Sequence, residues 1–533
     1  MGQAKLIPKD ASLIMVINTT AIEEKTKNIS FDKLDSTVNS ILPKEDSYKF
    51  VKEFGKLKEA IDFKDKFVFF MTQNLKGKET ITNLNLIASL KNAKLMEAAL
   101  KSNEDWKNKS ITVANGYSYF IPDNMFAISW NDKFVMLSIN PSKEVFNYDN
   151  INHSFKTIPA DTTTFLKQIA KYYALPDSES VASIKEFNDL TKEKADIYSF
   201  SNSTYLTSYL SLMPIQLVKL DSLVRDNYSA STISFENGKV ETNGTIYLNK
   251  GLAALFKKYS GTMVKTSLLD AYPTQNINGF ILASFNPEIL EGLLKELNVE
   301  SLLDGFLFRQ GLSTKDIYQC LNGDINIAFS DFKMGKNDKG SSSSGSAKYL
   351  MEASIGNKES FKKLMDLLLP LGYIIKDGNG YTLSPTLSGY AYLHTDDSKI
   401  IVATDAATYK DYISGKSKNN IDESIKSAVK GKSVAMYLNI DNMLSGIGHI
   451  TIYDTLISNN VQRLRNTIKD AIVTGDNLKD NMIKSHGELR LKDDKQNSLV
   501  LLHNMCMEIF KSVSSSFRKP NNSVIADSTV HSE

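Results

Sequence analysis

Four short stretches of this chain share one pattern, in which an apolar strand is followed by an asparagine and the start of a helix. In the clearest stretch an apolar run ends at Phe285, Asn286 follows, and the next apolar residues have helical spacing. Asn is a favoured helix N-cap because its side-chain oxygen accepts a hydrogen bond from a free N–H of the first turn. Pro287 suits the first helical position, where no N–H is needed. The other asparagines of this pattern are Asn18, Asn202 and Asn439.

The features around these asparagines recur in the same order in the two halves of the chain. Each half reads as a strand–asparagine–helix stretch, a hairpin, a capped helix, a meander of short strands, a second strand–asparagine–helix stretch and a closing hairpin with a helix. Short runs separated by turn residues are typical of antiparallel hairpins. We therefore expect an α+β fold of two tandem copies of an antiparallel-sheet unit, with the helices packed on one face. The expected units are residues 1–262 and 263–515, and 516–533 is expected to be a flexible tail.

Several element boundaries follow from local composition. The polar stretch Gln73–Thr82 and the Ser/Gly-rich stretch Lys333–Ser346 predict loops at the tips of hairpins. Residues Ser142–Lys194 predict a mostly helical connection, and Tyr453–Val473 predicts a helical insert. The sequence His486–Leu502 predicts the closing hairpin of the second copy.

Charge and hydropathy exclude several classes of protein. The 533 residues include 63 Lys and Arg against 61 Asp and Glu, a net charge of +2. This balance gives no general attraction to polyanions, and we expect no nucleic-acid partner. No apolar run reaches the roughly 18–20 residues that a transmembrane helix needs. The two cysteines, Cys320 and Cys506, lack a CxxC spacing, and two buried free thiols are favoured over one long-range disulfide.

The motifs that usually mark an active site are incomplete or absent. Gly431-Lys432-Ser433 resembles the end of a phosphate-binding loop, but Lys426 stands where that motif needs its first glycine. None of the six histidines stands in an HxH or HExxH arrangement. The flexible GSSSSGS stretch is unlike the strained turn that presents a nucleophilic serine. We therefore expect no enzyme activity, no cofactor and no metal site.

Tyrosines on the predicted meanders are candidate ligand-binding residues. Tyr is common on surfaces that bind sugars or proteins, because its ring is rigid and amphipathic. Cross-strand packing on one face of a sheet is the simpler explanation and the one we favour. The candidates are Tyr117, Tyr119, Tyr381, Tyr390 and Tyr392.

The first strand is preceded by IPKDA, in which Ile7, Pro8, Asp10 and Ala11 form a short motif. Together with the length of the chain, this motif resembles the large uncharacterised lipoproteins of Bacteroidetes cell envelopes, which contain a domain of unknown function. The resemblance implies a periplasmic or outer-membrane-associated lipoprotein, with a cytoplasmic location as the alternative. It also implies a lipid anchor on a cysteine that precedes this sequence. It transfers no catalytic residue.

These expectations combine into one leading hypothesis and two others. We expect a non-catalytic cell-envelope protein that binds a macromolecular partner, with a protein favoured. The alternative is a glycan-binding module that uses the five tyrosines. A third hypothesis, a hydrolase in the groove between the copies, requires histidines or carboxylates from both halves to converge.

Overall fold

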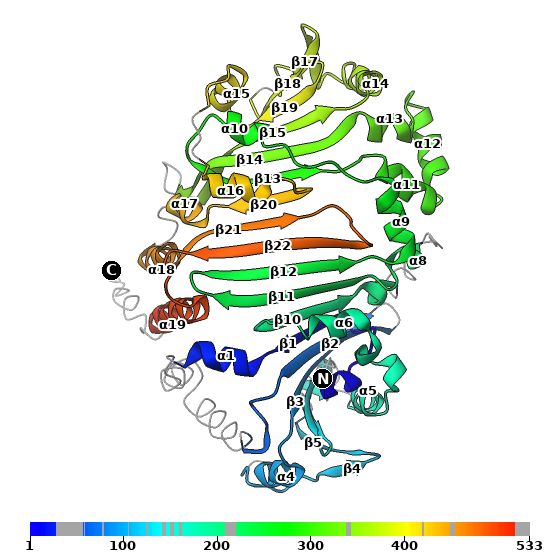
Figure 1. Cartoon of the computed structure of the whole chain (residues 1–533), viewed down its shortest axis with the longest axis vertical. Coiled ribbons are helices and arrows are strands. Elements are labelled where there is room, and N and C mark those ends of the chain that lie inside the picture. Colours follow the sequence, from blue (N-terminus) through cyan, green and yellow to red (C-terminus); the bar gives the residue numbers. More distant parts are fainter. Residues whose placement is uncertain are drawn as a thin grey trace, which may run out of the picture.

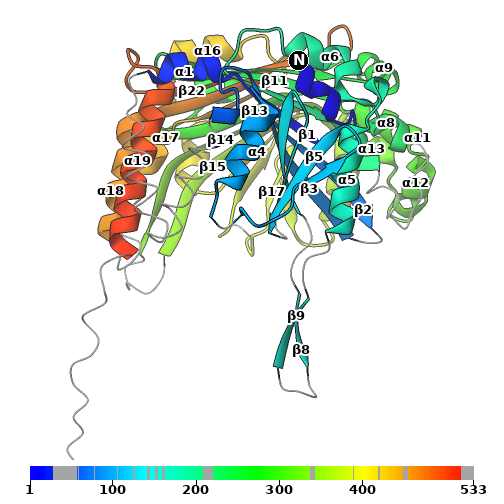
Figure 2. The same cartoon turned by 90° about the horizontal axis from the view of Figure 1, so that it is seen from below.

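The fold is α+β and is dominated by one large antiparallel sheet (Figure 1). The computed structural model describes residues 1–27, 57, 59–76, 79–104, 106–123, 126–140, 145–149, 154–158, 162–207, 220–336, 343–387, 389–417, 421–447 and 454–517. Eighteen strands of this part of the chain form the sheet. Seen end-on, the sheet is bent into an arch with a convex and a concave face (Figure 2).

Both halves of the chain contribute neighbouring strands to this sheet. The first half supplies, from the outer edge to the middle, β4 (Thr112–Ala114), β5 (Tyr117–Asp123), β6 (Phe126–Trp130), β7 (Phe134–Ile139), β3 (Glu79–Ser89), β2 (Phe67–Lys76), β1 (Leu13–Ile17), β10 (Ile197–Asn202), β11 (Tyr228–Glu236) and β12 (Lys239–Tyr247). The second half supplies, from the middle to the other edge, β22 (Met482–Leu491), β21 (Ile468–Gly475), β20 (Val434–Leu438), β13 (Ile277–Ser284), β14 (Leu321–Lys336), β15 (Ser343–Ile355), β19 (Lys399–Ala403) and β18 (Tyr392–Thr395).

The two halves meet at β12 and β22, and the order of pairing outward from this junction is the same on both sides. From β12 the next strands are β11, β10, β1, β2, β3, β7 and β6. From β22 they are β21, β20, β13, β14, β15, β19 and β18. Two small two-stranded ribbons are separate from this sheet. One pairs β8 (Val145–Asp149) with β9 (Ser154–Ile158), and the other pairs β16 (Ile374–Asp377) with β17 (Gly380–Leu383).

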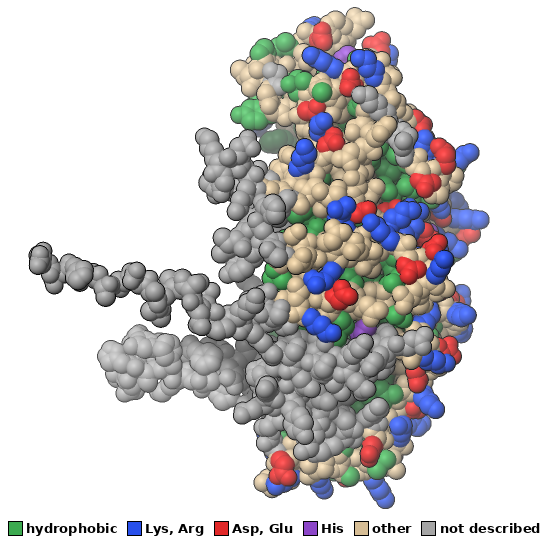
Figure 3. Space-filling view, turned by 90° about the vertical axis from the view of Figure 1, so that its left-hand side faces the viewer, with side chains coloured by type: hydrophobic (Ala, Val, Ile, Leu, Met, Phe, Trp, Pro, Cys, Tyr) green, Lys and Arg blue, Asp and Glu red, His purple; other side chains and the backbone are tan. Residues whose placement is uncertain are grey.

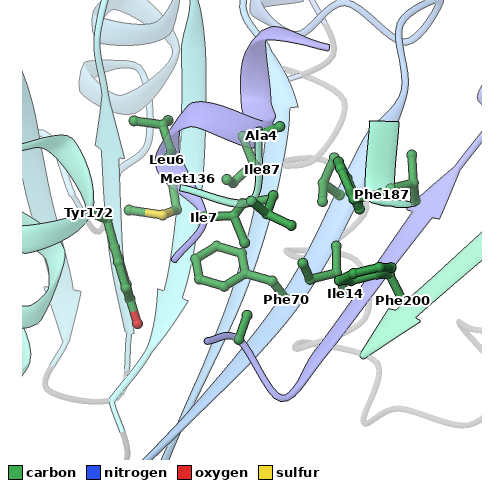
Figure 4. Close-up of a cluster of buried hydrophobic side chains, with 14 of the residues drawn as sticks. Ala4, Leu6, Ile7, Ile14, Phe70, Ile87, Met136, Tyr172, Phe187 and Phe200 are labelled. Carbon is green, nitrogen blue, oxygen red and sulfur yellow. The ribbon is translucent and has the colours of Figure 1, made fainter. Parts of the chain in front are cut away.

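The convex face is covered by helices that bury one side of several strands in each half. In the first half, Phe70 packs edge-on against Tyr172 with 5.2 Å between ring centroids, and Phe187 packs similarly against Phe200 at 5.4 Å (Figure 4). These side chains come from the sheet and from α5 (Thr163–Tyr173) and α6 (Lys185–Leu190). In the second half, α10 (Ser267–Ala271), α15 (Ala406–Ile413) and α16 (Glu423–Val429) cover the same face.

Within the part of the chain that the structure describes, helices cover the concave face only toward its two ends. At one end α4 (Ala93–Lys101) packs Met96 and Leu100 against Ala88, Val135 and neighbouring side chains. At the other end α14 (Lys358–Leu368) packs on strands β18 and β19. The expectation that helices lie on one face is therefore only partly right, because each end of the sheet is covered on both faces.

The remaining helices stand along the two long sides of the sheet (Figure 1). One side holds α1 (Thr19–Thr26), α17 (Ile440–Ser445), α18 (Asp454–Thr467) and α19 (Ser498–Phe517). The other side holds α8 (Leu220–Val224), α9 (Lys250–Lys258), α11 (Ile289–Glu296), α12 (Glu300–Phe308) and α13 (Thr314–Gln319). In the end-on view α18 and α19 stand on one side of the concave face, and α11 and α12 stand on the other (Figure 2).

Two of the predicted hairpin loops are wrong, because the strands continue through them. Within Gln73–Thr82 only residues 77–78 are outside β2 and β3, and Lys76 pairs with Glu79. Within Lys333–Ser346, β14 and β15 pair as far as Lys336 and Ser343. The backbone ladder needs only N–H and C=O groups, so polar side chains do not end a strand that already has a partner.

Three other boundaries also differ from the prediction. The segment Ser142–Lys194 contains the ribbon of β8 and β9 before its helices, and the end of Tyr453–Val473 is strand β21. The closing hairpin is formed by β21 and β22. Residues Ser498–Leu502, expected to be its second strand, are the start of α19, because a short apolar run fits a buried helix as well as a strand.

Three of the four capping asparagines lie where the sequence placed them. The side chains of Asn18, Asn202 and Asn439 accept hydrogen bonds from the N–H groups of Ala21, Thr204 and Asn442. Asn286 instead accepts from the Glu288 N–H at 3.0 Å and closes a turn, and α11 begins only at Ile289. The predicted cap at Asn286 is therefore wrong.

The predicted unit boundary at residues 262 and 263 lies in the connection between α9 and α10. Of the predicted tail, residues 516 and 517 end α19, and the rest lies outside the described residues.

Replacing Asn439 with Ala should loosen α17 locally. The substitution removes the acceptor for the Asn442 N–H, and loss of an Asn cap costs about 0.5–2 kcal/mol. We expect amide hydrogen exchange to show protection in α17 falling by about 2- to 30-fold. Asn439→Ser, which keeps an acceptor, should retain most of the protection, and Asn286→Ala should leave α11 nearly unchanged. Equal losses in α11 and α17 would contradict this assignment of the caps.

Candidate functional site

The concave side of strand β13 is apolar and exposed. Phe280 and Leu282 point to the convex side, where they are 1% and 0% exposed under the helices. Ile281 lies between them on the opposite side and is 45% exposed. A central strand that is apolar on both sides normally has both sides buried, so this exposure is unusual.

The neighbouring strands continue this surface. Ile281 pairs with Met436 on β20, which pairs with Val473 on β21, so the three side chains share one face. Met436 is 49% exposed and Val473 is 44% exposed. The strand registers place three further residues with exposed fractions between 42% and 47% on the same face, namely Ile246, Tyr349 and Val434. We call these six residues and the strands that carry them, β12 to β15 across β22, β21, β20, β13 and β14, the open face.

The middle of the concave side is made of small residues. One row that crosses five adjacent strands contains only glycine and serine, and its members are Gly475, Ser485, Gly244, Ser231 and Ser199. Apolar side chains lie beyond this row in the first half as well, where Leu137 is 36% exposed and Ile139 is 47% exposed. The concave side therefore carries small side chains in the middle and larger apolar side chains on each side of them.

Charged side chains gather elsewhere on the molecule. Seen from one long side, Lys, Arg, Asp and Glu crowd the right-hand outline, which belongs to the convex side (Figure 3).

A buried carboxylate lies on the convex side of the second half. Glu352 is 8% exposed and accepts hydrogen bonds from the Tyr412 hydroxyl at 2.5 Å, from Lys399 Nζ at 3.3 Å and from Ser267 Oγ at 3.3 Å. Burial, with the hydrogen bond to Glu352 and its negative charge, raises the pKa of Tyr412. The acceptor atoms of Glu352 are thus occupied by α10, α15 and β19. This arrangement fastens two helices to the sheet.

The five candidate tyrosines do not form one site. Tyr117 stacks on Tyr173 with 4.3 Å between ring centroids and lies 6.1 Å from Tyr119. Tyr381, Tyr390 and Tyr392 belong to the other end of the molecule. In Figure 1, β5, which carries Tyr117 and Tyr119, lies at one end, and β17 and β18 lie at the other. Burial raises the pKa values of Tyr117 and Tyr381.

Two of the three tyrosines in the second half pack against other rings. Tyr381 is 8% exposed and meets Phe361 edge-on at 6.3 Å, and Tyr392 stacks on Tyr409 at 5.8 Å. Tyr390 differs from them because it is 81% exposed. Packing against helices α14 and α15 thus accounts for the positions of Tyr381 and Tyr392.

A small polar cavity lies beside Tyr381. Its volume is 270 Å³, and its lining includes Lys358, Asn379, Asp396 and Asp397. Lys358 Nζ lies 3.5 Å from the Asp397 carboxylate. The cavity is large enough for a small polar molecule and its lining carries both signs of charge.

A buried aspartate anchors the helix that forms one wall of this cavity. Asp316 on α13 accepts hydrogen bonds from Ser313, from Ser360 Oγ at 3.1 Å and from Lys363 Nζ at 3.0 Å, the last two on α14. Burial raises the pKa of Asp316, but the hydrogen bonds from Ser313, Lys363 and Ser360 outweigh it and lower the pKa to about 2. The ionised carboxylate therefore holds α14 against α13.

The described residues contain no group of three or more His, Cys, Asp or Glu side chains placed to hold a metal ion. None of the described helices has the length and hydrophobicity that crossing a membrane requires. Cys320 is buried, as predicted, and its burial raises the pKa of the thiol. Cys506, on α19, is exposed, and the prediction that its thiol is buried is therefore wrong.

Comparison with known proteins gives little similarity. No protein-family model matches the chain. No curated protein matches it either. Among solved structures, crystal form III of TP0453 matches with a TM-score of 0.24 and 9% identity, over 48% of this chain and 85% of that chain. Crystal form I of TP0453 matches with a TM-score of 0.23 and 8% identity, over 46% and 78% of the two chains. A TM-score this low does not establish a shared fold.

Acid should weaken the protein through Asp316. Because its pKa is lowered by folding, its ionised form stabilises the fold at any pH above the ordinary value of 3.8. This stabilisation is lost as the pH falls from about 4 to about 2. We expect the urea midpoint of Asp316→Asn to be lower than that of the wild type at pH 6, and the two to converge toward pH 2. Asp366→Asn, an exposed change on α14, is the control that should follow the wild type; a constant difference between Asp316→Asn and the wild type down to pH 2 would refute this role.

Proposed function

We propose that this is a non-catalytic cell-envelope protein that binds a protein partner on its open face. The observation that carries the proposal is the exposure of Ile281, Met436 and Val473 on adjacent central strands. Burying exposed apolar surface is the main driving force of association, at roughly 25 cal/mol per Å². A soluble protein rarely leaves a contiguous apolar patch of this kind uncovered unless it is an interaction site.

The dimensions of the open face favour a macromolecule over a small ligand. From β15 to β12 the face crosses seven strands, which corresponds to about 29 Å at a strand spacing of about 4.8 Å. A standard protein–protein interface buries about 800 Å² on each partner. Interface cores are also depleted in charge and enriched in Met and aromatic residues, and Met436 and Tyr349 fit that composition.

Two buried carboxylates, those of Glu352 and Asp316, have a structural use, and this supports a non-catalytic role. Glu352 and Asp316 each accept hydrogen bonds from neighbouring elements. A general acid or base needs a position within reach of a substrate, whereas Glu352 joins two helices to the sheet and Asp316 joins α13 to α14. A binding role needs no such group.

The envelope location and the origin by duplication are parts of the same proposal. The location, periplasmic or outer-membrane-associated through an N-terminal lipid, is supported by the resemblance of the IPKDA motif. Duplication is supported by the shared order of strand pairing on the two sides of β12 and β22. Fractionation of the native cell would test the location, and recovery of the protein in the cytosol would contradict it.

The glycan-binding alternative has one favourable observation, the polar 270 Å³ cavity beside Tyr381. Sugars bind through aromatic faces with hydrogen bonds around them. Tyr381 is already packed against Phe361, however, and the other candidate tyrosines lie apart from the cavity lining. We therefore prefer the open face.

Site-specific photo-crosslinking tests the proposal in the native cell. A photo-reactive amino acid in place of Met436 should yield a crosslinked polypeptide that mass spectrometry identifies, because this side chain projects from the open face. The same residue in place of Tyr390, which is 81% exposed at the far end of the sheet, is the matched control and should not capture that polypeptide. Adding Val473→Asp should lower the yield at position 436 at least about tenfold, because a charge at an apolar interface is costly to desolvate. Crosslinks only to lipid, or the same polypeptide at both positions, would contradict the proposal.

A further inference from the structure

The polar cavity beside Tyr381 is formed by three segments that are separated in the sequence. Its lining comes from the start of α14, from the turn between β16 and β17, and from the turn between β18 and β19. In Figure 1, β17, β18 and α14 lie at the same end of the molecule. A cavity on which three elements converge is a candidate binding site, and this one lies outside the open face.

Close contact between the two turns fixes the shape of the cavity. A Cβ atom on Gly380 would overlap the carbonyl oxygen of Thr395, so this approach requires glycine. The backbone N–H of Tyr381 also donates a hydrogen bond to the Thr395 hydroxyl at 2.9 Å. The turns therefore hold each other in place, and the cavity is formed before any ligand arrives.

The apolar part of the lining consists of Ile355, Phe361 and Tyr381. Phe361 and Tyr381 belong to a buried cluster, and Ile355 packs against that cluster. The volume of 270 Å³ is below the range of about 300–1,000 Å³ that is usual for larger organic ligands. The cavity thus suits one small molecule that places an apolar group against these three side chains.

Two of the lysines that line the cavity already have carboxylate partners. Lys358 Nζ lies 3.5 Å from Asp397, and Lys362 Nζ lies 3.4 Å from Asp366, which is outside the lining. The charged groups of the lining are Lys358, Lys362, Lys376, Asp396 and Asp397. Lys376 and Asp396 remain when the paired groups are set aside.

Lys376 and Asp396 lie on different turns and are not paired with each other. Among the described residues, Lys376 has no carboxylate within 4 Å. Asp396 Oδ1 accepts hydrogen bonds from the N–H groups of Ser398 at 2.6 Å and of Lys399 at 2.9 Å, and within the same part of the chain Oδ2 has no hydrogen-bond donor. Burial raises the pKa of Asp396, but the hydrogen bonds from Ser398 and Lys399 outweigh it and lower the pKa below its usual value. The cavity therefore carries one cation and one anion that both lack a partner.

We propose that this cavity binds a free α-amino acid with an apolar side chain. Lys376 receives the carboxylate of the ligand, Asp396 Oδ2 receives its ammonium group, and the apolar side chain packs on Ile355, Phe361 and Tyr381. Hydrogen bonds between ionised groups are the strong ones, and a zwitterion makes them to both residues at once. A simple anion, a simple cation or a neutral sugar would leave at least one of the two charges without a partner. The proposal is independent of the open face.

Isothermal titration calorimetry of the full chain with three related ligands tests this proposal. We expect saturable binding of L-leucine. N-acetyl-L-leucine lacks the ammonium group and L-leucinamide lacks the carboxylate, so each should bind at least about tenfold more weakly, because each loses a hydrogen bond between charged groups. This comparison needs no variant, and its outcome does not depend on whether a substitution disturbs the fold.

Two variants assign the roles of the charged residues. Lys376→Gln and Asp396→Asn should each lower the affinity for L-leucine at least about tenfold, since each removes one charge that the ligand contacts. Asp396→Asn keeps the Oδ1 acceptor that closes the turn. Asp377→Asn is the matched control, because Asp377 is next to Lys376 on β16 but is not part of the lining, and it should bind L-leucine as the wild type does. Circular dichroism should show the same thermal transition for all three variants.

Four results would overturn the proposal. The first is a wild type that shows no saturable binding of L-leucine, and the second is N-acetyl-L-leucine or L-leucinamide binding as tightly as L-leucine. The third is unchanged affinity in folded Lys376→Gln and Asp396→Asn. The fourth is saturable binding of D-glucose in place of L-leucine, which would assign the cavity to sugars.

Discussion

The backbone pairing of β12 with β22 is the interaction on which the architecture depends. All nine residues of β12 pair with β22. The innermost strand of each half therefore supplies backbone hydrogen-bond partners to the innermost strand of the other half. An unpaired strand at either position would expose a row of N–H and C=O groups and invite aggregation. Side chains add to the junction, since Lys239 Nζ lies 2.5 Å from Glu488 and His486 Nδ1 lies 2.8 Å from Asn243 Oδ1. The pairing converts two helix-covered sheets into one continuous arch.

The two faces of that arch have different roles because helices cover them differently. On the convex side, residues such as Phe280 and Leu282 are sealed beneath helices and supply the stability of the fold. On the concave side, the described helices α4 and α14 cover only the ends, and the strands between them keep apolar side chains exposed. The proposed binding function follows from this difference in cover.

Local structure was largely predictable from the sequence, and long-range structure was not. The caps at Asn18 and Asn439 and the strand Leu13–Ile17 were predicted because capping and apolar periodicity act over a few residues. The junction of β12 and β22 has no local signal, because any alternating strand can pair along either edge. The strand–helix error at Ser498–Leu502 has a similar cause, since a short apolar run fits both structures.

The open face could not be predicted from the sequence for a related reason. The run Phe280–Phe285 correctly indicated a strand. Its apolar residues on both sides imply that both sides are buried, and only the structure shows that Ile281 is exposed. The tyrosines stood out by residue type, yet the structure divides them between the two ends of the sheet.

The oxidation rate of Met436 tests most directly whether the open face is accessible in the whole protein. Dilute hydrogen peroxide converts exposed methionines to sulfoxides faster than buried ones, and peptide mass spectrometry follows each site separately. Met436 is 49% exposed, whereas Met96 and Met136 are 1% and 0% exposed. The account predicts that Met436 is oxidised much faster than both in the folded protein, and that unfolding removes the difference. Protection of Met436 equal to that of Met136 in the isolated protein would show that the face is covered and would contradict the account.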